Sequence, residues 1–512
     1  MKLRLPRRRV WRVAIYLGAL LLIAIAIDLI IAHSRRTIRP GYLTTRIVQP
    51  RLPDGRIDYA VAIDTFFSRG VTPQNNAAVP LLQALGRQAI SDRQPVNGVT
   101  DALGMPPVPE AGEYFIAYED STRTRRPPAT NEAIDFSLPY APSAYPTEVT
   151  PEIREWVKAN ERVLPKIIEA TRRRRFFIPL FAGHRTVTLV EVQLKHVKAL
   201  KEVGAVLHAR ALMRLEAGNG AGFTEDILTV HRIARLLGQS STMVERVVAM
   251  AIEVSASLAD VAAARSGKLT PQQARDLIAA LTEVGDLPGY VDTIDRGERF
   301  LGHDIVQALA AMPPTEAGRL FNALQDRYTA PPWLFRFLPI PYERTMREMN
   351  QAYDGMVVAA HQPTYAQRVE ALRLWITDVD REVQSGAYVN LLSADWAISL
   401  LLPTLERANE RTETARMWNH LARVALALAA FKAEKGSYPA SLVELSPAYL
   451  RDVPIDSFVE RPLVYARQGD GYRLYSVGPN MKDDDGGKDE LLIDSEQAGT
   501  TTKTSSTGPA RS

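Results

Sequence analysis

The fold class is decided by residues 193–217, which read QLKHVKALKEVGAVLHARALMRLEA. The apolar side chains of this stretch recur at steps of three and four residues, at Leu194, Val197, Leu200, Val203, Leu207, Ala211 and Leu215. This spacing places them on one face of an α-helix, because a helix turns once every 3.6 residues. The stretch therefore predicts a long amphipathic helix that buries this face against other helices.

Three more helices are expected directly after this one. The Thr-Glu-Asp sequence at 224–226 begins a helix that runs to Leu237, since a hydroxyl caps a helix and carboxylates favour its positive end. A third helix covers 243–264, and Thr270–Gln273 (TPQQ) opens a fourth with a capping box. Because the connections are short, neighbours should pack antiparallel. We expect a mainly α protein, either a multi-helix bundle or an array of helical hairpins.

Length and composition limit the classes of protein that the chain can belong to. Its 512 residues suggest roughly three folded units at about 150 residues each. The absence of cysteine excludes disulfides, thiol nucleophiles and thiolate metal sites. The net charge is +4, and the basic residues before the first apolar run exceed this surplus: Lys2, Arg4, Arg7, Arg8, Arg9 and Arg12. The rest of the chain has no excess of positive charge, so we expect no nucleic-acid partner.

A membrane anchor is predicted at residues 13–32, VAIYLGALLLIAIAIDLIIA. Twenty helical residues span roughly 30 Å, the thickness of a bilayer's hydrocarbon core. The basic residues before the run place the N-terminus in the cytoplasm and the bulk of the chain on the extracytoplasmic side. A cleaved signal peptide and a buried core helix are the alternatives. The run is too long for a signal peptide, and Ala32–Arg35 makes a poor cleavage site.

The remaining chain divides into regions of different composition. The expected parts are the basic tail and anchor (1–36), a proline-rich lobe (37–149), a helical domain (150–403), a long helix with a β-hairpin module (404–494) and a disordered tail (495–512). Within the lobe, helices are expected at 57–67 and 77–85 and a short strand at 114–118. A second helical stretch, from Arg344 to Lys435, should break near Gln362-Pro363 and near Leu402-Pro403, because proline interrupts helices.

Three short motifs in the central region carry a first resemblance. They are Arg175-Phe176, the stretch RIARLLGQ at 232–239, and Gly297-Glu298-Arg299-Phe300. With them, residues 151–300 resemble the central region of an uncharacterised group of bacterial single-pass membrane-anchored helical proteins. That group implies a helical fold and an anchored topology, and it implies no activity.

An ordered series of motifs between residues 429 and 489 predicts a compact C-terminal module. A helix stopped by Gly436 precedes Ser437-Tyr438-Pro439, and Val453-Pro454-Ile455-Asp456 follows further on. The segments 463–468 and 472–477 alternate in polarity and are joined across Gly469-Asp470-Gly471, which predicts an antiparallel β-hairpin.

This order closely resembles the C-terminal region of the major pseudopilins of type II secretion. In that family the loop after the Ser-x-Gly turn binds calcium, which implies a Ca²⁺ site in the loop of this chain that carries Asp483, Asp484, Asp485 and Asp489. Carboxylate oxygens on a flexible turn suit Ca²⁺, and a solvated acidic turn is the alternative. Asn480 departs from the aspartate that is usual in the family. The anchor lies some four hundred residues before the hairpin, so we do not expect processing as a pilin.

Catalytic candidates are few. His303 and Asp304 lie close to Glu298, and these three side chains could form an acid–base cluster, although no nucleophile or ligand set accompanies them. The Gly-rich segment 218–222 follows a helix rather than a strand and is interpreted as a helix C-cap and turn. The aromatic segment 331–342 either contacts the bilayer or a partner, or packs as a buried connector.

Two functional hypotheses follow from these patterns. The first is a single-pass envelope protein with a structural or protein-interaction role, whose partners are envelope or secretion-related proteins. The alternative is a membrane-tethered hydrolase that uses His303, Asp304 and Glu298.

Overall fold

The computed structural model describes residues 38–92, 95–118, 149–180, 188–189, 192, 194–323, 331, 342–385, 394–487 and 490–495. Within this part of the chain the protein is mainly helical, with small antiparallel sheets near the C-terminus. The predicted anchor at 13–32 lies outside the described residues, as do Asp489 and most of the segment 331–342. The predicted mainly α class with a C-terminal hairpin is confirmed at this level.

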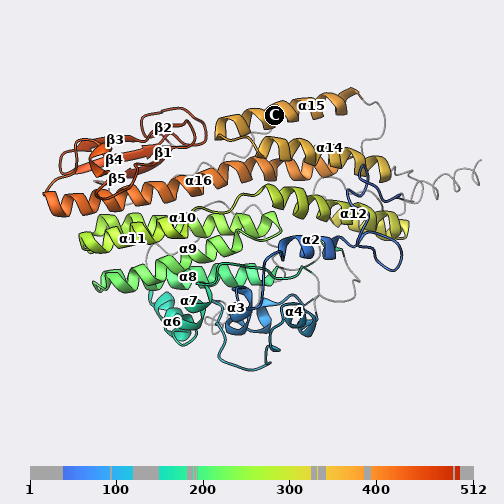
Figure 1. Ribbon diagram of the computed structural model, residues 1–512, viewed down its shortest axis with the longest axis horizontal. Coiled ribbons are helices and arrows are strands. Elements are labelled where there is room, and N and C mark those ends of the chain that lie inside the picture. The colour runs from blue at the N-terminus through green and yellow to red at the C-terminus, as the bar shows by residue number, and fades with distance from the viewer. Residues whose placement is uncertain are drawn as a thin grey trace, which may run out of the picture.

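The central bundle consists of long helices packed side by side (Figure 1). They are α8 (Lys195–Glu216), α9 (Gly220–Leu237), α10 (Met243–Ser266), α11 (Pro271–Val284) and α16 (Ala394–Lys435). Helix α10 packs against both α9 and α16, and its apolar face lies in the largest core. The predicted amphipathic helix at 193–217 and the helix that follows Thr270 are confirmed.

Helix α10 is the described helix that is long and apolar enough to cross a membrane. Its most apolar window is 72% buried within the protein, which is typical of a core helix. A capping box of Thr242 and Glu245 fixes its start, and Gly267, in the left-handed conformation at φ +65°, ends it.

A second group of helices packs on one half of α16. It comprises the π-helical turn η4 (Thr293–Glu298), α12 (Arg299–Ala311), α13 (Pro314–Ala323), α14 (Tyr342–Ala360) and α15 (Tyr365–Ser385). Methionine and tyrosine side chains of α14 fill a separate core with residues of α12, and they include Met346, Met349, Tyr353 and Met356. The predicted break near Gln362-Pro363 is confirmed, since α14 and α15 meet there.

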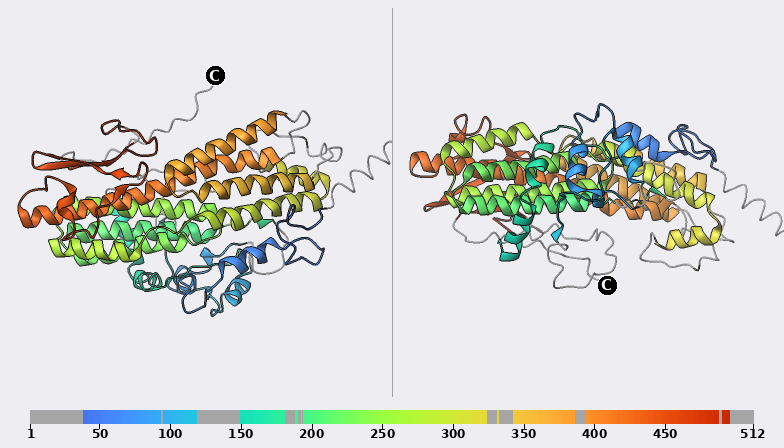
Figure 2. Two further views of the ribbon diagram at one scale, coloured as in Figure 1. Left: turned by 45° about the horizontal axis from the view of Figure 1, so that its top comes forward. Right: turned by 90° about the horizontal axis from the view of Figure 1, so that it is seen from below.

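The N-terminal lobe covers the opposite side of the bundle from the C-terminal module, as Figure 1 and the left view of Figure 2 show. Its helices are α2 (Tyr59–Phe67), α3 (Ala78–Leu85), the 3-10 turn η1 (Arg87–Ala89), α4 (Val96–Ala102), α6 (Pro151–Asn160) and α7 (Leu164–Ala170). Leu82 and Leu85 of α3 share one core with the bundle and with the module. The regions expected from composition therefore pack on a continuous interior.

The C-terminal module lies on the last turns of α16. It contains the 3-10 turn η7 (Leu442–Leu445) and two sheets, β1 (Ile455–Asp456) with β2 (Arg461–Pro462), and β3 (Val464–Gln468) with β4 (Gly471–Ser476) and β5 (Leu491–Asp494). In the hairpin Gln468 pairs with Gly471, and Gly469 has φ +51°, so a two-residue turn connects the strands. The hairpin is confirmed, and the third strand, β5, was not expected.

Three expectations about individual elements are wrong. Residues 114–118 form no strand; Phe115 instead donates its N–H to Ala84 of α3. Helix α9 starts at Gly220 rather than at 224, because the side chain of Asn219 accepts the N–H of Gly222 and caps the helix. Helix α16 continues through Pro403 without a break, so the boundary expected between residues 403 and 404 lies inside a single helix.

Candidate functional site

A group of charged side chains lies in the interior where α9, α10 and α16 meet. We call it the core charge network, and its members are His231, Arg235, Glu253, Asp260 and Asn419. All five are buried. Buried charges are costly unless they are paired, so the contacts among them decide what the group does.

Glu253 is the centre of the core charge network. Its carboxylate lies 2.8 Å from Nδ1 of His231 and accepts hydrogen bonds from Arg235 (3.0 Å from Nη2) and from Nδ2 of Asn419 (2.9 Å). The other ring nitrogen of His231, Nε2, lies 3.0 Å from Asp260. One carboxylate thus joins α9 and α10 to α16, although Asn419 lies 166 residues further along the chain.

These contacts determine the protonation states. Burial by itself would lower the pKa of His231, but Glu253 and Asp260 outweigh it and raise that pKa to about 9. Burial opposes ionisation of Glu253, yet Arg235 and His231 outweigh it and lower the pKa of Glu253 to about 2. His231 is therefore a cation at neutral pH, and Glu253 is an anion.

A small recess lies beside the core charge network, with about 10 Å³ of space for water-sized molecules. Its lining residues are Arg235, Glu253, Asp286, Leu287, Thr412, Ala415, Arg416 and Asn419. Ligand pockets for small molecules usually enclose about 300–1,000 Å³, so this recess is small. The charged groups around it bind one another, since Arg416 contacts both Asp286 and Glu413. We infer that these contacts fix the helices relative to one another.

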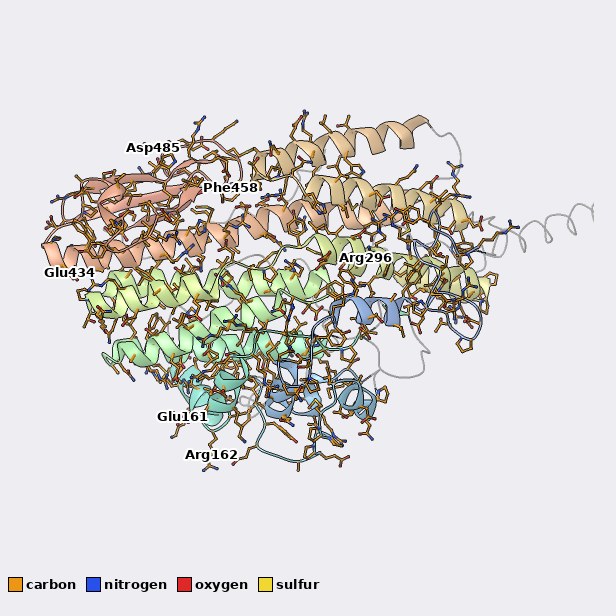
Figure 3. All side chains as sticks on the ribbon, viewed as in Figure 1. Glu161, Arg162, Arg296, Glu434, Phe458 and Asp485 are labelled. Carbon is orange, nitrogen blue, oxygen red and sulfur yellow. The ribbon has the colours of Figure 1, made fainter. Side chains whose placement is uncertain are left out.

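A second buried carboxylate, Glu413 of α16, connects the bundle with the module. It accepts from Arg368 of α15 at 2.5 Å and from the hydroxyl of Ser457 in the module. Beside it, Phe458 of the module packs edge-on against Tyr365 of α15, with ring centroids 4.8 Å apart. Figure 3 shows Phe458 between the sheet and the start of α15. The module is therefore held by α15 as well as by α16.

The three predicted catalytic side chains contact three different parts of the protein. Asp304 accepts the N–H of Leu189 at 2.9 Å, and Glu298 accepts the N–H of Met243 at 2.7 Å. Both ring nitrogens of His303 are buried without a hydrogen-bond partner among the described residues, so His303 is paired with neither carboxylate. Its ring lies 5.7 Å from that of Tyr59. The described geometry gives no acid–base cluster here.

Burial shifts the pKa values of His303 and Glu298 in opposite directions. Burial, with Arg299 and Arg46, lowers the pKa of His303 to about 3, so the ring is neutral. Burial also raises the pKa of Glu298 to about 7, against the opposing effect of the Met243 N–H. Glu298 thus satisfies a free N–H at the start of α10, where such groups have no partner within the helix.

Sequence reasoning missed the core charge network, although a signal for it exists. His231 and Arg235 are four residues apart on α9, and Glu253 and Asp260 are seven apart on α10. These spacings place each pair on one helix face, and most of the other buried positions of both helices are apolar. Charged residues that recur at the helical spacing of a buried, apolar face are therefore the sequence signal for this network.

The motifs behind the first resemblance have structural roles. A Cβ on Gly297 would lie 1.8 Å from the carbonyl oxygen of Ser241, so a larger residue would displace the backbone there. Arg299 is fully buried and donates to Asp295 at 2.7 Å and to Asp354 at 2.8 Å. Phe300 packs in the core near Tyr59. These residues position η4 and α12 against the bundle.

The motifs behind the pseudopilin resemblance likewise build the module. The carboxylate of Asp456 accepts the N–H of Phe458 at 3.0 Å and that of Val477 at 2.8 Å, and it connects the two sheets. Tyr438 stacks edge-on with Tyr472 at 4.8 Å. Helix α16 ends at Gly436, which has φ +81°.

The described carboxylates of the acidic loop all accept hydrogen bonds from other side chains of the module. Asp483 accepts from the hydroxyl of Tyr475 at 3.0 Å, Asp484 from Asn480 at 3.0 Å, and Asp485 from Arg473 at 3.0 Å. Figure 3 shows Asp485 on the outer side of the module. Calcium needs six to eight oxygens around one point. The described residues contain no group of three or more histidine or acidic side chains that could hold a metal ion. Each of Asp483, Asp484 and Asp485 is thus bound to a protein donor, and Asp489, the fourth predicted ligand, lies outside the described residues.

Comparison of the chain with protein-family models, with curated proteins and with solved structures finds no match. Both resemblances therefore stay predictions, and function has to be inferred from the contacts described above.

Proposed function

We propose that this protein is a single-pass membrane protein of the cell envelope with a structural or protein-interaction role. Its apolar segment 13–32 would anchor it, and its folded mass would lie on the extracytoplasmic side. The observation that carries the proposal is the continuity of α16, which extends from the bundle into the C-terminal module.

Because α16 is long and continuous, it can act as a rigid spacer between the two ends of the protein. Its 42 residues span about 63 Å at 1.5 Å per residue. Glu434 near its end binds Arg275 of α11 at 2.5 Å and Tyr449 of the module at 2.7 Å, and Lys432 donates to the carbonyl of Asp470 at 2.8 Å. Contacts on both sides of one long helix would keep the module at a fixed distance from the other end of the molecule.

The surface of the module supports a role in binding other proteins. Val443 is 75% exposed and Ile455 is 46% exposed, so apolar side chains are available on its outside. The pseudopilin resemblance makes envelope or secretion-related proteins the partners that we expect. No contact among the described residues favours the hydrolase hypothesis over this one.

The proposal is tested in native membranes with the full chain. A photo-crosslinking amino acid at Val443 should capture the same protein repeatedly, whereas the same group at Val358 of α14, which is 61% exposed, should not. Extraction with alkaline carbonate serves as the control for anchoring, and the chain should stay in the membrane pellet. Release by carbonate, or identical products at both positions, would contradict the proposal.

A further inference from the structure

We propose that a rigid turn at residues 41–46 presents Tyr42 and Leu43 to the outer surface of the bilayer, as a second membrane contact beside the anchor. This inference rests on the proposed function, because it requires the chain to leave a membrane just before the turn. The surface of the contact is defined here by Tyr42, Leu43 and Val48, together with Arg39 and Arg51.

Hydrogen bonds within the turn give it one shape. The hydroxyl of Thr44 donates to the carbonyl of Arg39 at 2.6 Å, and that of Thr45 donates to Ile47 at 2.6 Å. The N–H of Gly41 donates back to Thr45 at 2.9 Å. Thr44 and Thr45 are buried, so their side chains are on the inner side of the turn.

Side chains of the helices hold the turn against the protein. Asn350 of α14, itself buried, donates to the carbonyls of Leu43 at 3.1 Å and Thr44 at 2.7 Å. Arg46 binds Asp354 at 2.9 Å and lies over the ring of Tyr42 at 4.2 Å. The ring of Tyr42 is therefore oriented by a cation that is itself bound to α14.

The outer side of the turn is apolar and exposed. Tyr42 is 64% exposed, Leu43 68% and Val48 50%, while Arg39 and Arg51 are also at the surface. A tyrosine beside aliphatic side chains and arginines matches the interfacial region of a bilayer, where amphipathic rings and phosphate-binding cations are favoured. The hydrogen bonds of the turn hold these apolar side chains in their exposed positions, where a partner can reach them.

The position of the turn identifies the bilayer as that partner. Tyr42 follows Ala32, the last residue of the apolar run, by ten residues, and ten residues span at most about 35 Å. Arg39, just before the turn, donates its N–H to Glu343 at the start of α14 at 2.8 Å, and the turn itself lies beside Asn350 and Asp354 further along that helix. The C-terminal module lies at the opposite end of the molecule (Figures 1 and 2).

The chain has no cysteine, so a single introduced cysteine can be labelled selectively. An environment-sensitive fluorophore is attached to Leu43→Cys, and to the matched control Val443→Cys on the module, in the full-length protein. Both proteins are placed in nanodiscs of phosphatidylethanolamine and phosphatidylglycerol, with and without a spin-labelled lipid as quencher. Since both side chains are exposed, labelling should leave the fold intact; circular dichroism verifies this, and Tyr42→Cys is the second probe position.

We expect the fluorophore at position 43 to emit at a shorter wavelength than the one at position 443. The spin-labelled lipid should quench most of the fluorescence at position 43 and none at position 443. Protein that stays in the nanodisc fraction without quenching at 43 would overturn the second contact and leave the anchor standing. Equal quenching at both positions would also overturn the second contact. So would a shift of the emission at position 43 that requires added envelope proteins and does not occur with lipid alone. Protein that fails to enter nanodiscs would contradict the anchor itself, and the second contact with it.

Discussion

Helix α16 has two kinds of neighbours along its length. Around Glu413 and Asn419 it meets charged side chains, Arg368 of α15 and Glu253 of α10. From Leu421 to Ala430 its buried residues are small or aliphatic, and they share a core with Phe458 and Leu474 of the module. The first region has directional bonds in addition to buried apolar side chains such as Trp418, and the second is held by apolar burial.

The difference shows how one helix can have a defined orientation in the bundle and also hold the C-terminal module in place. Buried charge pairs add little net stability over apolar packing, but breaking one by removing a partner is strongly destabilising. Apolar contacts stabilise in proportion to the area that they bury, whatever the rotation of the helix. We infer that the charged region sets the rotation and register of α16. The apolar region provides most of the free energy that holds the module on the helix.

Removal of Glu253 should have the largest effect. Glu253→Ala leaves Arg235 and His231 buried without their common partner, and we expect a loss of about 5 kcal/mol in the free energy of unfolding. Denaturant unfolding measures this loss. Glu370→Ala, which removes an exposed carboxylate paired with Arg373, is the control and should leave stability almost unchanged. Similar losses in the two variants would remove the distinction between the core charge network and surface ion pairs.

Truncation of the apolar contact between the module and α15 should cost somewhat less. Phe458 is fully buried between the module and Tyr365, so Phe458→Ala should cost about 4 kcal/mol. Val443→Ala on the same module should be nearly neutral, because Val443 is exposed. Limited proteolysis would show whether the module detaches first. A uniform loss of protection across the bundle would contradict the separate roles of the two regions of α16.

Alkaline pH should weaken the charged region alone. The pKa of His231 is about 9 in the folded protein and about 6.5 in an unfolded chain. Its contribution to stability is therefore complete below pH 6.5 and is lost as the pH rises toward 9, by on the order of 3 kcal/mol. Unfolding curves of His231→Gln should show a smaller decline over this range.

His208 provides the matched control for this pH dependence. Burial lowers the pKa of His208 to about 4, so its contribution is lost as the pH falls below 6.5 toward 4. His208→Gln should therefore keep the alkaline decline of the wild type. An alkaline decline of equal size in His231→Gln would assign it to another group.

The acidic loop should give the smallest effect. Arg473 binds the carboxylate of Asp485, and Asp483 and Asp484 have other partners, so a chelator should leave the thermal midpoint unchanged. Differential scanning calorimetry with and without millimolar calcium measures this. A midpoint that rises with calcium and falls with chelator would show that the loop rearranges into a metal site that includes Asp489.

Local sequence signals predicted most of the helices and the hairpin. The Thr270 capping box and the glycine turn at 469–471 act between residues close together in the chain, so the pattern alone was sufficient. Pro403 is inside a helix because local propensity can be overridden by packing further along α16. Strand β5 is only four residues long, and its pairing with β4 depends on contacts across the acidic loop.

The core charge network could not be predicted in the same way, because residues that are close in sequence do not come together in the structure. Glu298 and Asp304 are six residues apart, which on a helix separates their directions by about 120°. They consequently reach different partners, Met243 of α10 and Leu189. The residues that do come together, Glu253 and Asn419, are on helices distant in sequence.

Protease accessibility with a tag at the C-terminus tests most directly whether the bundle and the module lie outside the cytoplasm on a single anchor. In intact spheroplasts, external protease should remove the tag and reduce the chain to its folded core. In inverted membrane vesicles, the tag and the folded part of the chain should both be protected from the protease. Digestion of the tag in inverted vesicles, with protection in intact spheroplasts, would contradict the proposed topology.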